Sequence, residues 1–257
     1  MQLLHSKIQG TGQPLLILHG YFGMGDNWKS QANNLSKKYE VHLIDQRNHG
    51  RSFHSDDFDY ELLVEDLKNY VAHYKLESVH LLGHSMGGKT AMLFAVSYPE
   101  KVKSLLVADI APKNYPPHHH QILEALNAVD FSKIKLRNEV DAVLKNYINE
   151  EGVRQFLLKN IYRKTKTELA FRFNLESLTE NNSEVGEPLP AFAEFDGPTL
   201  FLKGGNSGYI AAEDEGQIKA HFSDSEIVTV KNAGHWLHAE NPSDFLKEVE
   251  DFLSKHN

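Results

Sequence analysis

The segment LLGHSMGGKT, residues 81–90, passes from an apolar strand-like run into a helix-forming tail and holds one serine between glycines. Within it, GHSMG (residues 83–87) matches the pattern G-x-S-x-G, with Ser85 at the serine position. A strand before the pattern and a helix after it predict a tight turn that presents the Ser85 hydroxyl above the edge of a sheet. Small residues are needed on either side because strand and helix crowd such a turn. Ser85 is therefore the candidate nucleophile.

The bulk composition sets limits on what the chain can be. Its 257 residues are 40% hydrophobic and 24% charged, with a net charge of −8, which is typical of a globular protein and disfavours a nucleic-acid partner. No apolar run reaches the roughly 18 residues of a membrane span, and the N-terminus lacks a signal-peptide pattern, so we expect a cytoplasmic protein. The absence of cysteine excludes disulfides and thiol catalysis.

Strand-like runs alternate with helical patterns along most of the chain. This alternation predicts a single α/β domain over residues 1–257, with a mostly parallel sheet flanked by helices. Between about residues 112 and 190 the pattern is helical throughout, so we expect an inserted all-helical cap there. The strand candidates are Pro14–Gly20, Glu40–Gln46, Ser78–His84, Lys103–Pro112, Pro198–Gly205 and Glu226–Gly234.

A serine hydroxyl needs a base that takes its proton. In NAGHWLHAENP, residues 232–242, His235 directly follows a predicted strand and a glycine. The carboxyl ends of parallel strands lie at one edge of a sheet, so His235 is expected near Ser85. His238 is the nearby alternative, and its approach to the next helix favours a structural role.

Seven segments in order along nearly the whole chain resemble one enzyme family. The chain resembles the serine-dependent α/β-hydrolases, and among them the YbfF-type acyl-CoA esterases and carboxylesterases. The resemblance implies an α/β-hydrolase fold with a catalytic triad. The segments are LHGYFGMGDNW, DQRNHGRS, GHSMGGKTAM, DIAPKNY, NEEGVRQFLLKN, LFLKGGNSGYI and NAGHWLHAENP.

The acid of the triad has several candidates. Many α/β-hydrolases carry it after the strand that here ends in LFLKGGNSGY, where Asn206 and Ser207 cannot bear a negative charge. Asp109 instead ends the strand that follows the helix after Ser85, and YbfF-like enzymes take the acid from that earlier strand. We expect Asp109 to orient His235. Asp214 and Asp196 are the alternatives.

Backbone N–H groups are expected to stabilise the oxyanion. The helix that starts after Ser85 offers the N–H of Met86, and the loop after LLILHG offers that of Tyr21, with Phe22 as its near alternative. The side chain of Phe22 is also expected to bind substrate.

These residues predict a serine esterase or thioesterase that works through an acyl-enzyme on Ser85. The resemblance and a mildly basic insertion, with 11 Lys/Arg against 8 Asp/Glu over residues 112–177, suggest acyl-CoA thioesters or simple carboxylic esters as substrates. We expect no metal and no organic cofactor. The alternatives are a perhydrolase, a C–C hydrolase or lyase on the same fold, and a hydrolase-like ligand sensor with low turnover.

Overall fold

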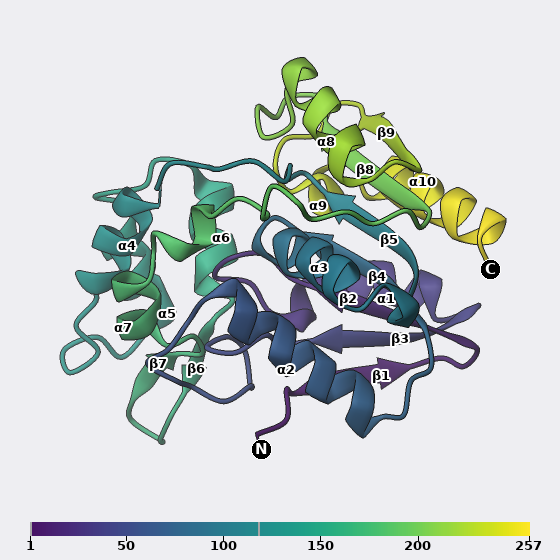
Figure 1. Cartoon of the computed structure of the whole chain (residues 1–257). Coiled ribbons are helices and arrows are strands. Elements are labelled where there is room, and N and C mark those ends of the chain that lie inside the picture. Colours follow the sequence, from purple (N-terminus) through teal and green to yellow (C-terminus); the bar gives the residue numbers. More distant parts are fainter. Residues whose placement is uncertain (1, 118) are drawn as a thin grey trace.

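A seven-stranded sheet forms the centre of the computed structural model, which describes residues 2–117 and 119–257 (Figure 1). The strand order is β1-β3-β2-β4-β5-β8-β9, with β1 antiparallel to β3 and every other pair parallel. The mostly parallel α/β fold and its six predicted strands are thereby confirmed. The strands are β1 (Ser6–Gln9), β2 (Gln13–Leu18), β3 (Tyr39–Ile44), β4 (Val79–His84), β5 (Val102–Ala108), β8 (Thr199–Gly204) and β9 (Ser225–Val230).

Helices cover both faces of this sheet, which is why its strands are apolar on both sides. Along β2, Leu16 and Leu18 pack in a cluster with α2 and α3, whereas Leu15 and Ile17 pack in a second cluster with α1 and α10. The helices around the sheet are α1 (Lys29–Leu35), α2 (Tyr60–His73), α3 (Met86–Ser97), α8 (Glu215–His221), α9 (Leu237–Glu240) and α10 (Pro242–Lys255). Short 3₁₀ helices are η1 (Gly25–Trp28), η2 (Pro99–Lys101), η3 (Glu184–Gly186) and η4 (Ala212–Asp214).

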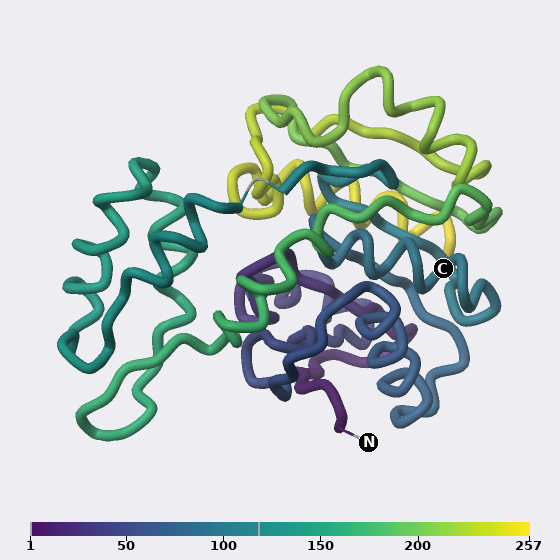
Figure 2. Tube along the Cα trace, turned by 60° about the vertical axis from the view of Figure 1, so that its left-hand side comes forward, coloured from purple at the N-terminus to yellow at the C-terminus, as the bar shows by residue number. Residues whose placement is uncertain are grey.

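The chain between β5 and β8 leaves the sheet and forms a cap on one side of the core (Figure 2). Its helices are α4 (His120–Asn127), α5 (Arg137–Leu144), α6 (Glu151–Leu158) and α7 (Leu175–Glu180). The expectation of an all-helical insertion needs correction, because β6 (Ile161–Arg163) and β7 (Leu169–Phe171) form an antiparallel hairpin. Aromatic and β-branched residues in these two strands favour the extended conformation. Each strand has only three residues, which are too few to show a strand period in the sequence.

The hydrophobic core of the cap is continuous with residues next to Ser85. Leu126, Val140 and Leu157 of the cap are fully buried in one cluster with Tyr21 and Met86. The cap therefore packs directly on the loop after β2 and on the start of α3. Within the described residues, no helix is long and apolar enough to cross a membrane.

Candidate active site

Ser85 stands at the turn between β4 and α3 in a backbone conformation that few residues adopt. Its φ is 53° and its ψ is −120°, outside the regions favoured by L-residues. The Ser85 N–H donates a hydrogen bond to the carbonyl of Ala108 at 3.0 Å, which ties the turn to β5. A Cβ atom on Gly83 would lie 2.1 Å from the carbonyl oxygen of Gly87, and one on Gly87 would lie 2.5 Å from that of His19. Close approach of the backbone therefore requires glycine at both positions. The surrounding structure holds Ser85 in its strained conformation.

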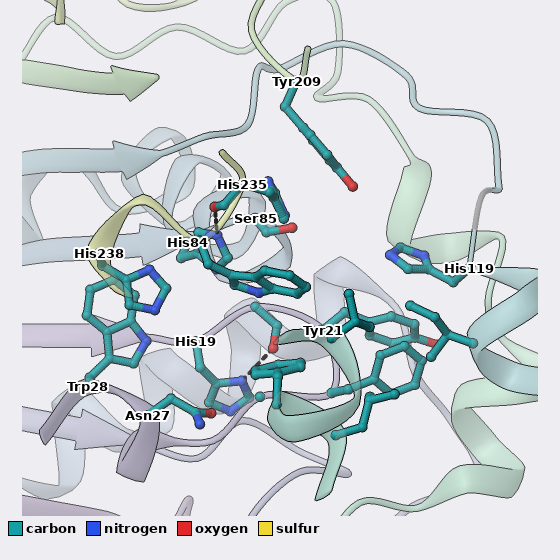
Figure 3. A pocket seen from close by; sticks show the side chains of 18 residues that line it. His19, Tyr21, Asn27, Trp28, His84, Ser85, His119, Tyr209, His235 and His238 are labelled. Atoms are coloured by element: carbon teal, nitrogen blue, oxygen red, sulfur yellow. Dashed lines mark hydrogen bonds between the residues drawn. The ribbon is translucent and has the colours of Figure 1, made fainter. Parts of the chain in front are cut away.

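His235, in the loop after β9, lies beside Ser85 in the same cavity (Figure 3). Its Nδ1 donates a hydrogen bond to Oδ2 of Asp109 at 2.8 Å. This bond leaves Nε2 as the nitrogen that can accept a proton. No hydrogen bond joins His235 to the Ser85 hydroxyl in the described part of the chain, and such bonds commonly tighten only when substrate is bound.

Asp109 comes directly after β5, and its side chain is fully buried. Its φ of 53° is in the left-handed region, where a non-glycine residue is uncommon. Besides the bond from His235, the carboxylate accepts the N–H of Gly204 on Oδ1 at 2.9 Å and the hydroxyl of Ser207 on Oδ2 at 2.5 Å. A buried carboxylate with three donors has the partners that its charge requires.

The two alternative acids lie elsewhere. Asp214 forms an ion pair with Lys113 at 2.6 Å, and Asp196 accepts a hydrogen bond from Ser223 at 2.7 Å. Of the three candidates, only Asp109 bonds to His235. The hydrogen bond from Ser207 to Asp109 has no signal in the sequence, because a side chain without a charge does not stand out as part of the acid.

The backbone around Ser85 offers two unpaired donors. Met86 is the first residue of α3, and Tyr21 lies in the loop after β2. Neither backbone N–H has a hydrogen-bond partner among the residues that the structure describes. The N–H of Phe22, the near alternative, donates to Nε2 of His49 at 3.2 Å and is therefore occupied. The Phe22 side chain lines the cavity, where it was expected to bind substrate.

The cavity in front of Ser85 has a volume of about 220 Å³. Its cap side is mostly apolar, with Ile122, Val153 and Leu157 among the lining residues beside His119. The ring of Tyr209 stacks on His235 with centroids 3.8 Å apart and planes at 17°. The structure thus places the candidate nucleophile and base in a partly open cavity under this mostly apolar surface.

Three further histidines around the cavity are held neutral. Burial lowers the pKa of His19 to about 4, that of His238 to about 3 and that of His84 well below its usual 6.5. The Nε2–H of His84 donates to the backbone carbonyl of His235 at 2.8 Å, so His84 helps to hold the loop of the base. His238 is stacked on Trp28 and, among the described residues, has no carboxylate partner, whereas His235 has one in Asp109 and lies beside Ser85. The described residues include no group of three or more His, Asp or Glu placed to hold a metal ion.

Known proteins share this architecture. The alpha/beta hydrolase fold family matches residues 13–147. Mouse (Mus musculus) sn-1-specific diacylglycerol lipase ABHD11 is 37% identical over 93% of this chain and 80% of its own length. Esterase YbfF of Escherichia coli is 32% identical over 96% of this chain and 95% of its own. A solved marine microorganism esterase superimposes with a TM-score of 0.95 at 44% identity, covering 98% of this chain and all of that one.

Proposed function

The chain belongs to the α/β-hydrolase family and is a hydrolase of the esterase and lipase type, and we propose that it cleaves carboxylic esters or acyl-CoA thioesters through an acyl-enzyme on Ser85. One observation supports the mechanism above the others. Nδ1 of His235 is bonded to a buried carboxylate, and its ring lies beside Ser85 in one cavity.

In the first half of the reaction, Oγ of Ser85 attacks the carbonyl carbon while Nε2 of His235 takes the hydroxyl proton. Asp109 holds the imidazole in the required tautomer and stabilises the imidazolium. The negative charge that develops on the carbonyl oxygen is met by the N–H groups of Met86 and Tyr21. His235 then gives its proton to the leaving alcohol or thiol.

In the second half, water replaces the alcohol. His235 takes a proton from the water, whose oxygen attacks the acyl carbon. The bond from this carbon to Oγ of Ser85 then breaks, His235 returns the proton to Oγ, and the carboxylic acid is released. These steps use only side chains and backbone groups of this chain together with water, so we propose that no organic cofactor takes part.

Hydrolysis of p-nitrophenyl esters of graded acyl length tests the proposal. Ser85→Ala is expected to lower turnover by about 10⁶ relative to the wild type if the triad acts as a unit. Labelling of the intact protein by a fluorophosphonate, followed by mass spectrometry, should place the adduct on Ser85. Equal hydrolysis by both proteins would overturn the assignment.

The same panel separates the other activities. A perhydrolase would form peracid when hydrogen peroxide is added, and a ligand sensor would bind esters without measurable turnover. A C–C hydrolase or lyase would leave simple esters intact. A parallel series of acyl-CoA thioesters measures the preference between oxygen and sulfur esters through the ratio of kcat/KM values.

A further inference from the structure

The cavity in front of Ser85 has a polar end away from the apolar cap side. Figure 3 shows Trp28, Asn27 and His238 grouped at this end, with Tyr21 and His119 at the opposite end and Ser85 between them. We call the group formed by Trp28, Asn27 and His238 the polar subsite. The mechanism proposed above uses none of its three side chains.

The subsite carries hydrogen-bonding groups that the protein leaves unpaired. The His238 side chain is 7% exposed, and neither of its ring nitrogens has a hydrogen-bond partner among the described residues. Nδ1 is fully buried, so Nε2 is the nitrogen that a ligand in the cavity can reach. The amide nitrogen of Asn27 and the indole N–H of Trp28 likewise have no partner in the described part of the chain, since Asn27 uses only its oxygen, to accept from Met24. Buried polar groups are nearly always paired, so the unpaired ring of His238, which lines the cavity, indicates a ligand. Asn27 is half-buried and adds a donor beside it.

The orientation of His238 is fixed by its neighbours. Its ring lies flat on the indole of Trp28, with centroids 4.0 Å apart and planes at 9°. Burial lowers its pKa to about 3. It is therefore neutral at ordinary pH, and its Nε2 either donates or accepts one hydrogen bond, according to the tautomer.

The charge of the lining disfavours an ionic group at the polar subsite itself. None of the described residues that line the cavity is an Asp, Glu, Lys or Arg. A carboxylate or phosphate bound at these side chains would lack a countercharge. A hydroxyl group both donates and accepts, and it matches what the polar subsite offers.

The position of the polar subsite relative to His235 indicates which part of the substrate the subsite binds. The leaving alcohol must lie next to His235, which protonates it. The ring of His84 bridges the two sites, with its centroid 4.7 Å from that of His235 and 4.9 Å from that of His238. The acyl chain is then left to the apolar cap side.

We propose that the polar subsite binds a hydroxyl group on the leaving alcohol, so that the enzyme favours uncharged esters of diols and polyols with an apolar acyl chain. This inference rests on the proposed function, because it assigns the two ends of the cavity to the two parts of an ester.

Two butyrate esters of equal size test the inference. n-Propyl butyrate and 2-hydroxyethyl butyrate differ only by a methyl group in place of a hydroxyl. Each kcat/KM is divided by the rate constant for hydroxide-catalysed hydrolysis of the same ester, which removes the difference in intrinsic reactivity. The wild type is expected to favour the hydroxyl ester by about three- to tenfold, the effect of one neutral hydrogen bond.

His238→Phe keeps the stacking on Trp28 and removes both ring nitrogens, so the preference should fall to about one. Trp28→Phe is a second variant, which removes the indole N–H and should also lower the preference. His73→Phe is the matched control, because His73 is exposed on α2 and its replacement should leave both rates unchanged.

A wild-type preference of one or less overturns the subsite, and so does an undiminished preference in folded His238→Phe or, if that variant fails to fold, in Trp28→Phe. Hydrolysis of both esters at equal rates leaves the proposed function standing. Failure to hydrolyse either ester, with no fluorophosphonate adduct on Ser85, would instead overturn the proposed function and the subsite with it.

Discussion

The hydroxyl of Ser207 donates a hydrogen bond to Oδ2 of Asp109 across 2.5 Å and joins the loop after β8 to the end of β5. The same oxygen accepts the bond from His235. In many α/β-hydrolases the loop after β8 carries the acid. Here this loop is linked to His235 indirectly, because Ser207 and His235 both bond to Asp109. Ser207 supplies a neutral donor that fixes the carboxylate, whereas Asp109 supplies the charge.

Asp109→Asn is expected to lower turnover by up to about 10⁴, because an amide cannot hold His235 in the required tautomer. Ser207→Ala should cost much less, about tenfold, because the carboxylate keeps its charge and the N–H of Gly204. Initial rates with a p-nitrophenyl ester measure both effects. Asp196→Asn is the control and should behave as the wild type. If Asp109→Asn retains activity while Asp214→Asn loses it, the acid has been assigned wrongly.

The placement of Ser85, His235 and Asp109 could be predicted because all three follow parallel strands. The carboxyl ends of such strands lie at one sheet edge, and the turn signals after β4, β5 and β9 are strong in the sequence. The structure brings the three residues together in this way. Their chemical roles remain proposals that the variants above test.

Other features lack a local signal. The strand β1 is short and half-exposed, and the hairpin of β6 and β7 has three residues in each strand. The bonds of Ser207 to Asp109 and of His84 to the carbonyl of His235 join residues that are 98 and 151 positions apart. Contacts of this kind depend on the tertiary structure and cannot be read from spacing.

The lowered pKa values of several buried histidines predict that the protein loses stability in mild acid. Burial lowers the pKa of His19 to about 4 and that of His49 to about 3 in the folded protein, whereas both are near 6.5 in the unfolded chain. Below about pH 6.5 the unfolded chain therefore binds protons that the folded protein excludes. The free energy of unfolding should fall as the pH is lowered from 6.5 towards 4, by about 1.4 kcal/mol per pH unit for each fully titrating histidine.

Urea unfolding between about pH 7 and pH 5 measures this slope, in a range where most carboxylates stay charged. His49→Gln keeps an acceptor for the N–H of Phe22 and removes one titrating group, so its slope should be shallower. The control is His73→Gln, which replaces an exposed side chain at the end of α2 and should give the wild-type slope. An unfolding free energy that is constant between pH 7 and pH 5 would contradict the prediction.

Lys89 lies on α3, the helix that begins after Ser85, and connects this helix to the cap. Its side chain is 1% exposed, and Nζ donates to the carbonyls of Lys113 at 2.7 Å, Gly186 at 3.0 Å and Glu187. Lys113 precedes the cap helices and the other two residues follow them, so one ammonium group holds both ends of the insertion. This contact was not foreseen from the sequence, because a lysine is almost always exposed.

Lys89→Met should destabilise the protein by about 1–3 kcal/mol, because three carbonyls lose a charged donor. Burial lowers the pKa of Lys89 to about 7, which shows that desolvation offsets part of the gain and keeps the expected loss modest. Urea unfolding measures the stability, and limited proteolysis should cut the ends of the cap faster. Lys68→Met, at an exposed position of α2, is the control, and equal proteolysis of the two variants would show that Lys89 does not anchor the cap.

The glycine two positions before Ser85 allows a sharper test of the turn than Ser85 itself. A Cβ on Gly83 would meet only backbone, with the carbonyl oxygen of Gly87 at 2.1 Å and Cα of Gly88 at 2.7 Å. No flexible side chain can give way, so α3 must shift relative to β4. Because a displacement of about 1 Å at a reacting group can cost about 10² in rate, we expect Gly83→Ala to lower kcat/KM by on the order of 10²-fold or more.

The matched control is Gly152→Ala in α6, where nothing lies within 4 Å of the added methyl. This variant should keep full activity and gain up to about 1 kcal/mol, because alanine favours a helix over glycine. Ester hydrolysis and urea unfolding are measured for both variants. Overpacking should also destabilise Gly83→Ala by about 1–3 kcal/mol. A folded Gly83→Ala with wild-type kcat/KM would show that the turn can yield without moving Ser85, and the glycine before it would then serve folding alone.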